Sequence, residues 1–346
     1  MKTKAAILVE QNKPIIIDEI EIPKLLPGQV LVEIKYSGIC QSQLNEWRGK
    51  KGKDPYLPHT FGHEGTGVVL DTGPNVTKVK PGDYVVLTWI KSTGANVPGC
   101  AYKDNSGKTI NSGAISTFME KSVVSENRLV PINKNDIPLD LAALLGCAIL
   151  TGGGMVVNEL KPQAGESIAI WGIGGIGACA VMAAAALGCK PIIAIDIKDN
   201  KLNLAKELGA DILINGNNEP LEKIMEITDN NGVDFGIESV GNVKVMEAGF
   251  EAVKKSGGKF IIAGNAKKDD KIKINPFDLI AGKKILGSWG GAAKPDEDIP
   301  KYIKQFKNGK LPIDKLITHC ISLENINEAF NLLESGDAGR ILIKIN

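Results

Sequence analysis

Hydrophobic residues in the first 135 positions come in short β-type runs that are separated by turns. Such runs lie at 30–36, 67–70 and 84–88, and turn residues such as Pro81-Gly82-Asp83 separate them. Short runs of β-branched and aromatic residues bounded by Gly, Pro and Asp are typical of strands joined by tight turns. The pattern therefore predicts a β-rich domain at the start of the chain.

Between about 168 and 262 the pattern changes, because strand-like and helix-like segments alternate. An apolar β-type run at 167–170 is followed by residues 178–188, which are rich in helix formers, and by a second run at 191–195. Strands that alternate with helices predict a parallel sheet with crossover helices. We therefore expect an α/β domain after the β-rich one.

The last part of the chain combines helices with a strand. Helices are predicted over 299–307 and 326–335, and a closing strand over 340–345. Before them, residues 271–276 alternate between lysine and isoleucine and end in Asn-Pro. Alternation that ends in proline predicts an edge strand at this position.

The turn between the first α/β strand and its helix carries the motif G-x-G-x-x-G. Strand, glycine motif, helix, second strand and a following acid, Asp196, make up the dinucleotide fingerprint. Its glycines allow a tight turn, close approach of a pyrophosphate and close helix packing. The alternative, a βαβ unit that binds nothing, is disfavoured because every part is present. The expected cofactor contacts are Gly172, Gly174, Gly175, Ile176, Gly177 and Asp196.

Asp196 also predicts which cofactor is used. A carboxylate at the end of the second strand accepts hydrogen bonds from a ribose diol and repels a 2′-phosphate. NAD is therefore expected rather than NADP.

Composition narrows the class of protein. A chain of 346 residues suggests two domains, and 43% hydrophobic residues are ample for their cores. A net charge of +1 gives no reason to expect a nucleic-acid partner. The sequence shows no apolar stretch that predicts a signal peptide or a membrane span. Six cysteines in so long a chain predict no disulfide framework, so a cytoplasmic location with free thiols is expected.

Three segments of the chain carry residues that bind metals. Cys40 lies in YSGICQSQ, His63 in FGHEGTG and Cys147 in LLGCAILTG. One such segment alone does not indicate a metal site, since a single cysteine is most often a small buried hydrophobic residue. In this order and spacing, with the nucleotide fingerprint and the segments LITH and INEAF, they resemble the zinc-containing alcohol dehydrogenases of the medium-chain dehydrogenase/reductase (MDR) superfamily. The resemblance extends over nearly the whole chain.

The resemblance implies an α/β fold with a Rossmann doubly wound parallel sheet domain and a β-rich, GroES-like catalytic domain. The catalytic domain is expected at 1–150, the Rossmann domain at 151–289, and a return to the catalytic domain at 290–346. It also implies that Cys40, His63 and Cys147 hold a catalytic zinc ion. Two thiolates and an imidazole suit Zn²⁺ and leave a fourth position open for water or substrate.

Residues next to these ligands are assigned by the same resemblance. Ser42 carries the hydroxyl that takes the proton of the alcohol, and Glu64 is either a carboxylate that approaches the metal or a plain surface acid. Asn45 replaces a relay histidine and cannot titrate near neutral pH. Gln43 replaces an aspartate beside the metal, so the zinc charge is less well compensated. Gln41 replaces a basic residue of the pyrophosphate site.

Further contacts follow from family position alone. Those expected to line the substrate cleft are Trp47, Trp89 and Ile149. Those expected to touch the cofactor are Thr151, Lys201, Trp289 and Arg340. A lysine on a helix surface and an arginine near a closing strand would otherwise face solvent.

The resemblance leads to a function with open alternatives. We expect a zinc- and NAD-dependent alcohol dehydrogenase that acts on a small alcohol or carbonyl compound and forms a homodimer or homotetramer. The stretch 89–112 has one cysteine, Cys100, where many relatives carry four, so no structural zinc is expected. The alternatives are a polyol or sugar dehydrogenase, an aldehyde reductase, or an inert nucleotide-binding relative.

Overall fold

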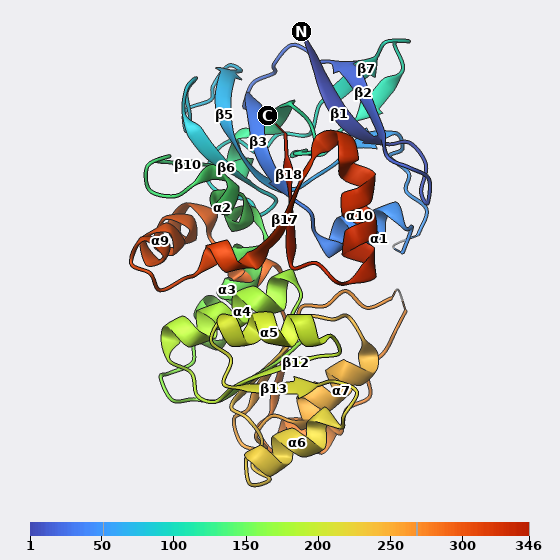
Figure 1. Ribbon diagram of the computed structural model, residues 1–346. Helices are drawn as coiled ribbons and strands as arrows, with labels where there is room; N and C mark the ends of the chain where they lie inside the picture. The colour runs from blue at the N-terminus through green and yellow to red at the C-terminus, as the bar shows by residue number, and fades with distance from the viewer. Residues whose placement is uncertain (51, 268, 346) are drawn as a thin grey trace. The chain divides into compact units, whose positions relative to one another are not determined.

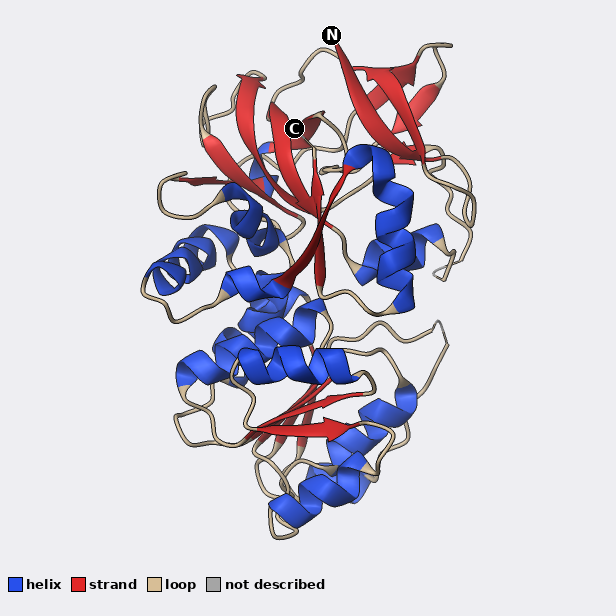
Figure 2. Cartoon of the chain, in the orientation of Figure 1, coloured by secondary structure: helices blue, strands red, loops and turns tan. Residues whose placement is uncertain are grey.

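The computed structural model describes residues 1–50, 52–267 and 269–345. The chain divides into two compact units. Unit 1 comprises Met1–Cys147, Lys294–Gly309 and Ile317–Asn346, and unit 2 comprises Ala148–Ala293 and Lys310–Leu316. Figures 1 and 2 show that each unit has its own sheet and its own helices. The division differs in detail from the expected boundaries, because a short segment after position 309 returns to unit 2.

Unit 1 contains two β structures. Five strands close a barrel in the order β1 (Lys2–Leu8), β2 (Ile16–Glu21), β7 (Ala101–Asp104), β8 (Thr109–Asn111) and β4 (His59–Thr60). The second is a seven-stranded sheet in the order β10 (Leu129–Ile132), β6 (Tyr84–Thr88), β5 (Glu64–Thr72), β3 (Gln29–Gly38), β18 (Arg340–Lys344) and β17 (Ile317–Ser322), with β9 (Lys121–Ser125) paired to β3. The β-rich first domain and the closing strand are therefore present.

Strand β3 shows why the sequence forms this sheet. Val30, Val32 and Ile34 pack in one hydrophobic cluster with residues of β5, β6 and β9. Leu31 packs in a different cluster with Tyr102 and its neighbours. Successive side chains of a strand point to opposite faces, so a continuous apolar run serves two cores at once.

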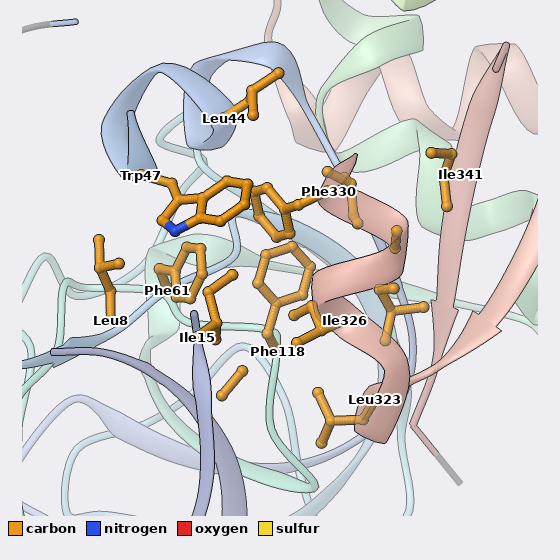
Figure 3. Packing of buried hydrophobic residues seen from close by; sticks show 14 of the residues in the cluster. Leu8, Ile15, Leu44, Trp47, Phe61, Phe118, Leu323, Ile326, Phe330 and Ile341 are labelled. Carbon is orange, nitrogen blue, oxygen red and sulfur yellow. The ribbon is translucent and has the colours of Figure 1, made fainter. Parts of the chain in front are cut away.

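The helices of unit 1 are α1 (Gln41–Trp47), α2 (Leu139–Ala143), α9 (Pro295–Lys307) and α10 (Ile326–Ser335). Of these, α1 and α10 pack against an aromatic cluster (Figure 3). In α10, Ile326, Ala329 and Phe330 are fully buried. Their spacing along the sequence places them on one face of the helix. Helix α9 begins four residues before the predicted start at 299, because Pro295 occupies its first turn and three acidic residues follow it.

Unit 2 is a six-stranded sheet in which every pairing is parallel. The order is β13 (Ile212–Asn215), β12 (Ile192–Asp196), β11 (Ile168–Trp171), β14 (Phe235–Glu238), β15 (Lys259–Ile262) and β16 (Lys284–Gly287). Its helices are α3 (Ala148–Gly154), α4 (Gly175–Leu187), α5 (Asp199–Glu207), α6 (Pro220–Ile227), α7 (Val243–Glu251) and α8 (Pro276–Ile280). The order reverses at β11, as in doubly wound dinucleotide-binding sheets. The predicted fold class is confirmed.

Other helical segments, which are not α-helical, lie between these elements. They are η1 (Glu126–Arg128), η2 (Leu144–Gly146), η3 (Met155–Leu160), η4 (Gly290–Ala292), η5 (Ile313–Leu316) and η6 (Leu323–Asn325).

The edge strand predicted at 271–276 is wrong. Residues 271–275 lie outside any strand, and Pro276 is the first residue of helix α8. The Asn275 side chain accepts a hydrogen bond from the Phe277 backbone N–H, at 3.0 Å. An asparagine cap followed by proline at the first helical position is a stronger local signal than two repeats of lysine and isoleucine. The edge strand on this side of the sheet is β16.

Among the described residues, no single helix is long and apolar enough to cross a bilayer. One bent pair of segments, Leu139–Gly146 and Ala148–Leu160, is long and apolar enough to cross a bilayer by length and composition alone. Most residues of this pair are buried in the fold.

Candidate functional site

Cys40, His63 and Cys147 come together in unit 1. Cys40 follows β3 and precedes α1, His63 immediately precedes β5, and Cys147 follows η2. One ligand atom from each residue lies within 4.8 Å of the other two. The three predicted metal ligands therefore form one cluster, although they are far apart in the sequence.

Gly146 lets the segment that carries Cys147 approach the sheet. A Cβ atom at position 146 would overlap the carbonyl oxygen of Leu87 on β6 and lie 2.8 Å from the Cβ of Glu64 on β5. Any residue other than glycine would push this segment away from the sheet. The ligand Cys147 is placed by the close backbone contact beside it.

The chemistry of the cluster fits a zinc ion. A hydrogen bond with Cys147, together with His63 and the nearby charge of Arg340, holds the pKa of the Cys40 thiol well below its usual range. A thiolate is the form of cysteine that binds metals. Among the described residues, the buried Nε2 atom of His63 has no hydrogen-bond partner. A buried nitrogen without a partner, beside two cysteines, is a donor set that suits Zn²⁺.

A buried ion pair lies next to Cys40. The Arg340 guanidinium on β18 contacts the Glu64 carboxylate on β5, and their side chains are 6% and 0% exposed. Burial lowers the pKa of Arg340. The sequence left Glu64 as either a carboxylate that approaches the metal or a plain surface acid, and its complete burial excludes the surface acid. The sequence placed Arg340 on the cofactor and did not predict its contact with Glu64. Both assigned roles remain predictions.

Helix α1 holds the residues that differ from the family pattern. The Gln43 side-chain oxygen accepts a hydrogen bond from the Cys40 backbone N–H, at 2.8 Å. Gln41 donates a hydrogen bond to Asn45 one turn later, at 3.2 Å. Among the described residues, the buried Ser42 hydroxyl has no partner. Gln43 therefore orients the backbone of a ligand, and Ser42 has its hydroxyl available.

The two tryptophans expected in the substrate cleft differ in their surroundings. The Trp89 indole N–H donates a hydrogen bond to Sγ of Cys147, at 3.2 Å. Trp47 is buried in the aromatic cluster, with its ring 5.5 Å from that of Phe330 and its N–H bonded to the Lys13 carbonyl oxygen (Figure 3). Trp47 thus has a packing role, and its expected place in a substrate cleft stays a prediction.

The dinucleotide fingerprint is built as predicted within unit 2. A Cβ atom on Gly177 would overlap the carbonyl oxygen of Gly172, so only glycine lets helix α4 start this close to the turn. A Cβ atom on Gly174 would meet no protein atom within 4 Å. The turn thus has open space at the glycine expected against a pyrophosphate, and Gly175 and Ile176 begin helix α4 directly after it.

Asp196 at the end of β12 has a role that sequence reasoning did not foresee. Its carboxylate accepts hydrogen bonds from the backbone N–H groups of Ile173, at 2.7 Å, and Lys198, at 3.0 Å. A carboxylate has about four acceptor positions, so capacity for a ribose diol remains. Asp196 therefore fixes the glycine-rich turn and can still bind a ribose.

The remaining predicted contacts in unit 2 are placed as follows. Ile149 and Thr151 lie on α3 and are buried, and among the described residues the Thr151 hydroxyl has no partner. Lys201 is a buried residue of α5, and Trp289 is exposed in the segment after β16. Their substrate and cofactor roles stay predictions.

Two family models match most of the chain. Residues 26–134 match the alcohol dehydrogenase GroES-like domain, and residues 175–308 match the zinc-binding dehydrogenase domain. Alcohol dehydrogenase 1 of Trifolium repens is 31% identical over all of this chain and 97% of the relative. The chain belongs to the zinc-containing alcohol dehydrogenases of the MDR superfamily.

Solved structures of this family superimpose on the whole chain. Benzyl alcohol dehydrogenase from Acinetobacter calcoaceticus has a TM-score of 0.91 and 31% identity, covering 100% of both chains. 2R,3R-butanediol dehydrogenase from Bacillus subtilis has a TM-score of 0.81 and 28% identity, covering 99% of this chain and 100% of the other. The β-rich unit is thus a GroES-like domain and the protein is an oxidoreductase of the alcohol dehydrogenase type.

Proposed function

We propose that this alcohol dehydrogenase transfers a hydride between an alcohol and NAD and holds one catalytic zinc ion per chain. The observation that carries the proposal is the convergence of Cys40, His63 and Cys147 on one point, with the buried Ser42 hydroxyl two residues from a ligand. A zinc ion bound there would acidify an alcohol or polarise a carbonyl group.

The residues around this point would each have a part in the reaction. Cys40, His63 and Cys147 would hold the metal, and Gln43 keeps the Cys40 backbone in place through its hydrogen bond. The Ser42 hydroxyl takes the proton of the alcohol. Asn45 does not titrate near neutral pH, so it could not take that proton from Ser42.

The direct test is an NAD-linked activity screen combined with metal analysis. We expect about one zinc per chain and turnover on a panel of primary alcohols, secondary alcohols, polyols and sugars. Benzyl alcohol and 2,3-butanediol belong on the panel, because they are the substrates named for two similar structures. A metal-free protein without turnover on any compound would contradict the proposal and favour an inert relative.

Cofactor choice yields a prediction for Asp196. NADP would lose the hydrogen bond between its ribose and the charged Asp196. Loss of such a bond costs roughly 1.5–3 kcal/mol, so we expect a preference of roughly ten- to a hundredfold for NAD over NADP. We choose Asp196→Asn over alanine, because the amide oxygen of asparagine still accepts one of the two backbone hydrogen bonds, from Ile173 or from Lys198, while the charge is lost. The variant should lower the ratio of kcat/KM with NAD to kcat/KM with NADP. Its zinc content should stay as in wild type.

The control for that experiment is Asp199→Asn. Asp199 is an exposed acid at the start of α5, close in sequence to Asp196, and its carboxylate accepts a hydrogen bond from Asn215. Asp199→Asn should leave the ratio of kcat/KM with NAD to kcat/KM with NADP as in wild type. Equal use of both cofactors by wild type, or an unchanged ratio in Asp196→Asn, would show that Asp196 does not bind the ribose.

We also propose that the protein forms a homodimer or homotetramer. Strand β16 is the edge of the six-stranded sheet, and the preceding helix α8 exposes Phe277 and Ile280 at 66% and 79%. An edge strand beside exposed apolar side chains is a surface that a second copy can cover. Light scattering at micromolar concentration should give a dimer or tetramer, and Ile280→Glu should shift it toward monomer. A monomeric wild type would contradict this proposal.

We propose a cytoplasmic location because the cysteines are free thiols. All six cysteines are free, including the metal-binding pair. Free thiols persist in a reducing compartment.

A further inference from the structure

We propose that Trp89 is a positioning residue that tunes the metal by hydrogen bonding to its ligand Cys147. The inference rests on the proposed zinc site and deepens it. The observation is the 3.2 Å contact between the indole nitrogen Nε1 of Trp89 and Sγ of Cys147. Indole N–H is a donor only, so the direction of this hydrogen bond is fixed, and the sulfur accepts.

Other contacts hold the ring of Trp89 in this position. Its backbone carbonyl, directly after β6, accepts a hydrogen bond from the guanidinium of Arg128. Its ring also meets the imidazole of His63 edge-on, with ring centres 6.5 Å apart and planes at 68°. Trp89 is thus fixed against two of the three residues that would hold the metal.

The hydrogen bond has a chemical consequence for the metal. A thiolate is a charged acceptor, and hydrogen bonds to charged groups are stronger than those between neutral groups. The N–H group draws electron density from sulfur, so Cys147 donates less of it to the metal and the metal stays more electrophilic.

A second feature of the chain acts in the same direction. Gln43 is a neutral amide, and its oxygen accepts a hydrogen bond from the Cys40 backbone N–H. It adds no negative charge beside the ligands. The Trp89 N–H and the neutral Gln43 together predict a metal with greater Lewis acidity than a carboxylate at position 43 would give.

The test uses cobalt(II)-substituted protein, in which the thiolate-to-cobalt charge-transfer band reports the electron density on sulfur. In Trp89→Phe an aromatic ring remains and the N–H is lost, so sulfur holds its electrons less tightly and the band should move to longer wavelength. The kcat/KM of the zinc enzyme should fall about tenfold, or ~1.4 kcal/mol. Replacing Trp89 with benzothienylalanine, which keeps the double ring and lacks only the N–H, should give the same shift.

Trp47→Phe is the matched control. It removes another buried indole N–H from the same unit, but the acceptor of that bond is the Lys13 carbonyl oxygen and not a sulfur. Its band should stay at the wild-type wavelength. If the band also stays there in both Trp89 variants, the inference is overturned while the metal site stands. If cobalt-loaded wild type shows no thiolate band at all, the proposed metal site falls, and the inference with it.

Discussion

Replacing Cys147 with serine is expected to release the metal and abolish alcohol oxidation. A serine hydroxyl is not ionised near neutral pH, whereas zinc binds the thiolate form of cysteine. Only two of the three ligands would remain. A Lewis acid contributes several kcal/mol to such a reaction, so the loss should reach about a thousandfold or more.

Metal content and NAD-linked turnover measure this effect on one protein sample. Unit 2 should stay folded, because its sheet contains no metal ligand, and NAD binding by the variant would show this. Cys320→Ser is the control, since Cys320 is an exposed free thiol on β17. A Cys147→Ser protein with full zinc and wild-type turnover would remove Cys147 from the ligand set.

The second large effect is expected on stability, from the ion pair between Glu64 and Arg340. Both side chains are almost fully buried. Glu64→Gln keeps the shape of the side chain and leaves the guanidinium charge without its carboxylate. Breaking a buried pair in this way costs about 3–5 kcal/mol. Hydrogen exchange of the β3 and β18 amides should detect this as a lower free energy of opening in unit 1.

An exposed pair in the same unit provides the comparison. Arg48 and Glu334 form an ion pair with side chains 26% and 42% exposed. Glu334→Gln should cost less than about 1 kcal/mol, because water screens an exposed pair. If Glu64→Gln costs no more than Glu334→Gln, the buried pair does not contribute to stability as proposed.

The sequence predicted the parts of this molecule whose signals are local. Alternation of strands and helices predicted the fold class, and the glycine motif followed by Asp196 predicted a turn that the structure contains. The prediction of an edge strand at 271–276 was wrong because Asn275 and Pro276 begin a helix. This capping signal outweighs two repeats of lysine and isoleucine. The same kind of signal at Pro295 moved the start of α9.

Other features could not be predicted because they depend on contacts between distant segments. The position of Trp47 within α1 does not show that its ring lies against Phe330 of α10. The charge of Arg340 does not show that Glu64 compensates it. Family resemblance gave these residues a role in binding, and only the packed structure shows which partners they have.

The order of strands in unit 1 determines when this unit can be completed during synthesis. Strand β18, at the end of the chain, pairs with β3 on one side and with β17 on the other. The sheet therefore lacks an interior strand, and Glu64 lacks its buried counter-ion, until β18 has left the ribosome. The six strands of unit 2 are all translated earlier, so this unit can form its sheet first. A chain truncated before β18 should keep the parallel sheet of unit 2 and lose the fold of unit 1.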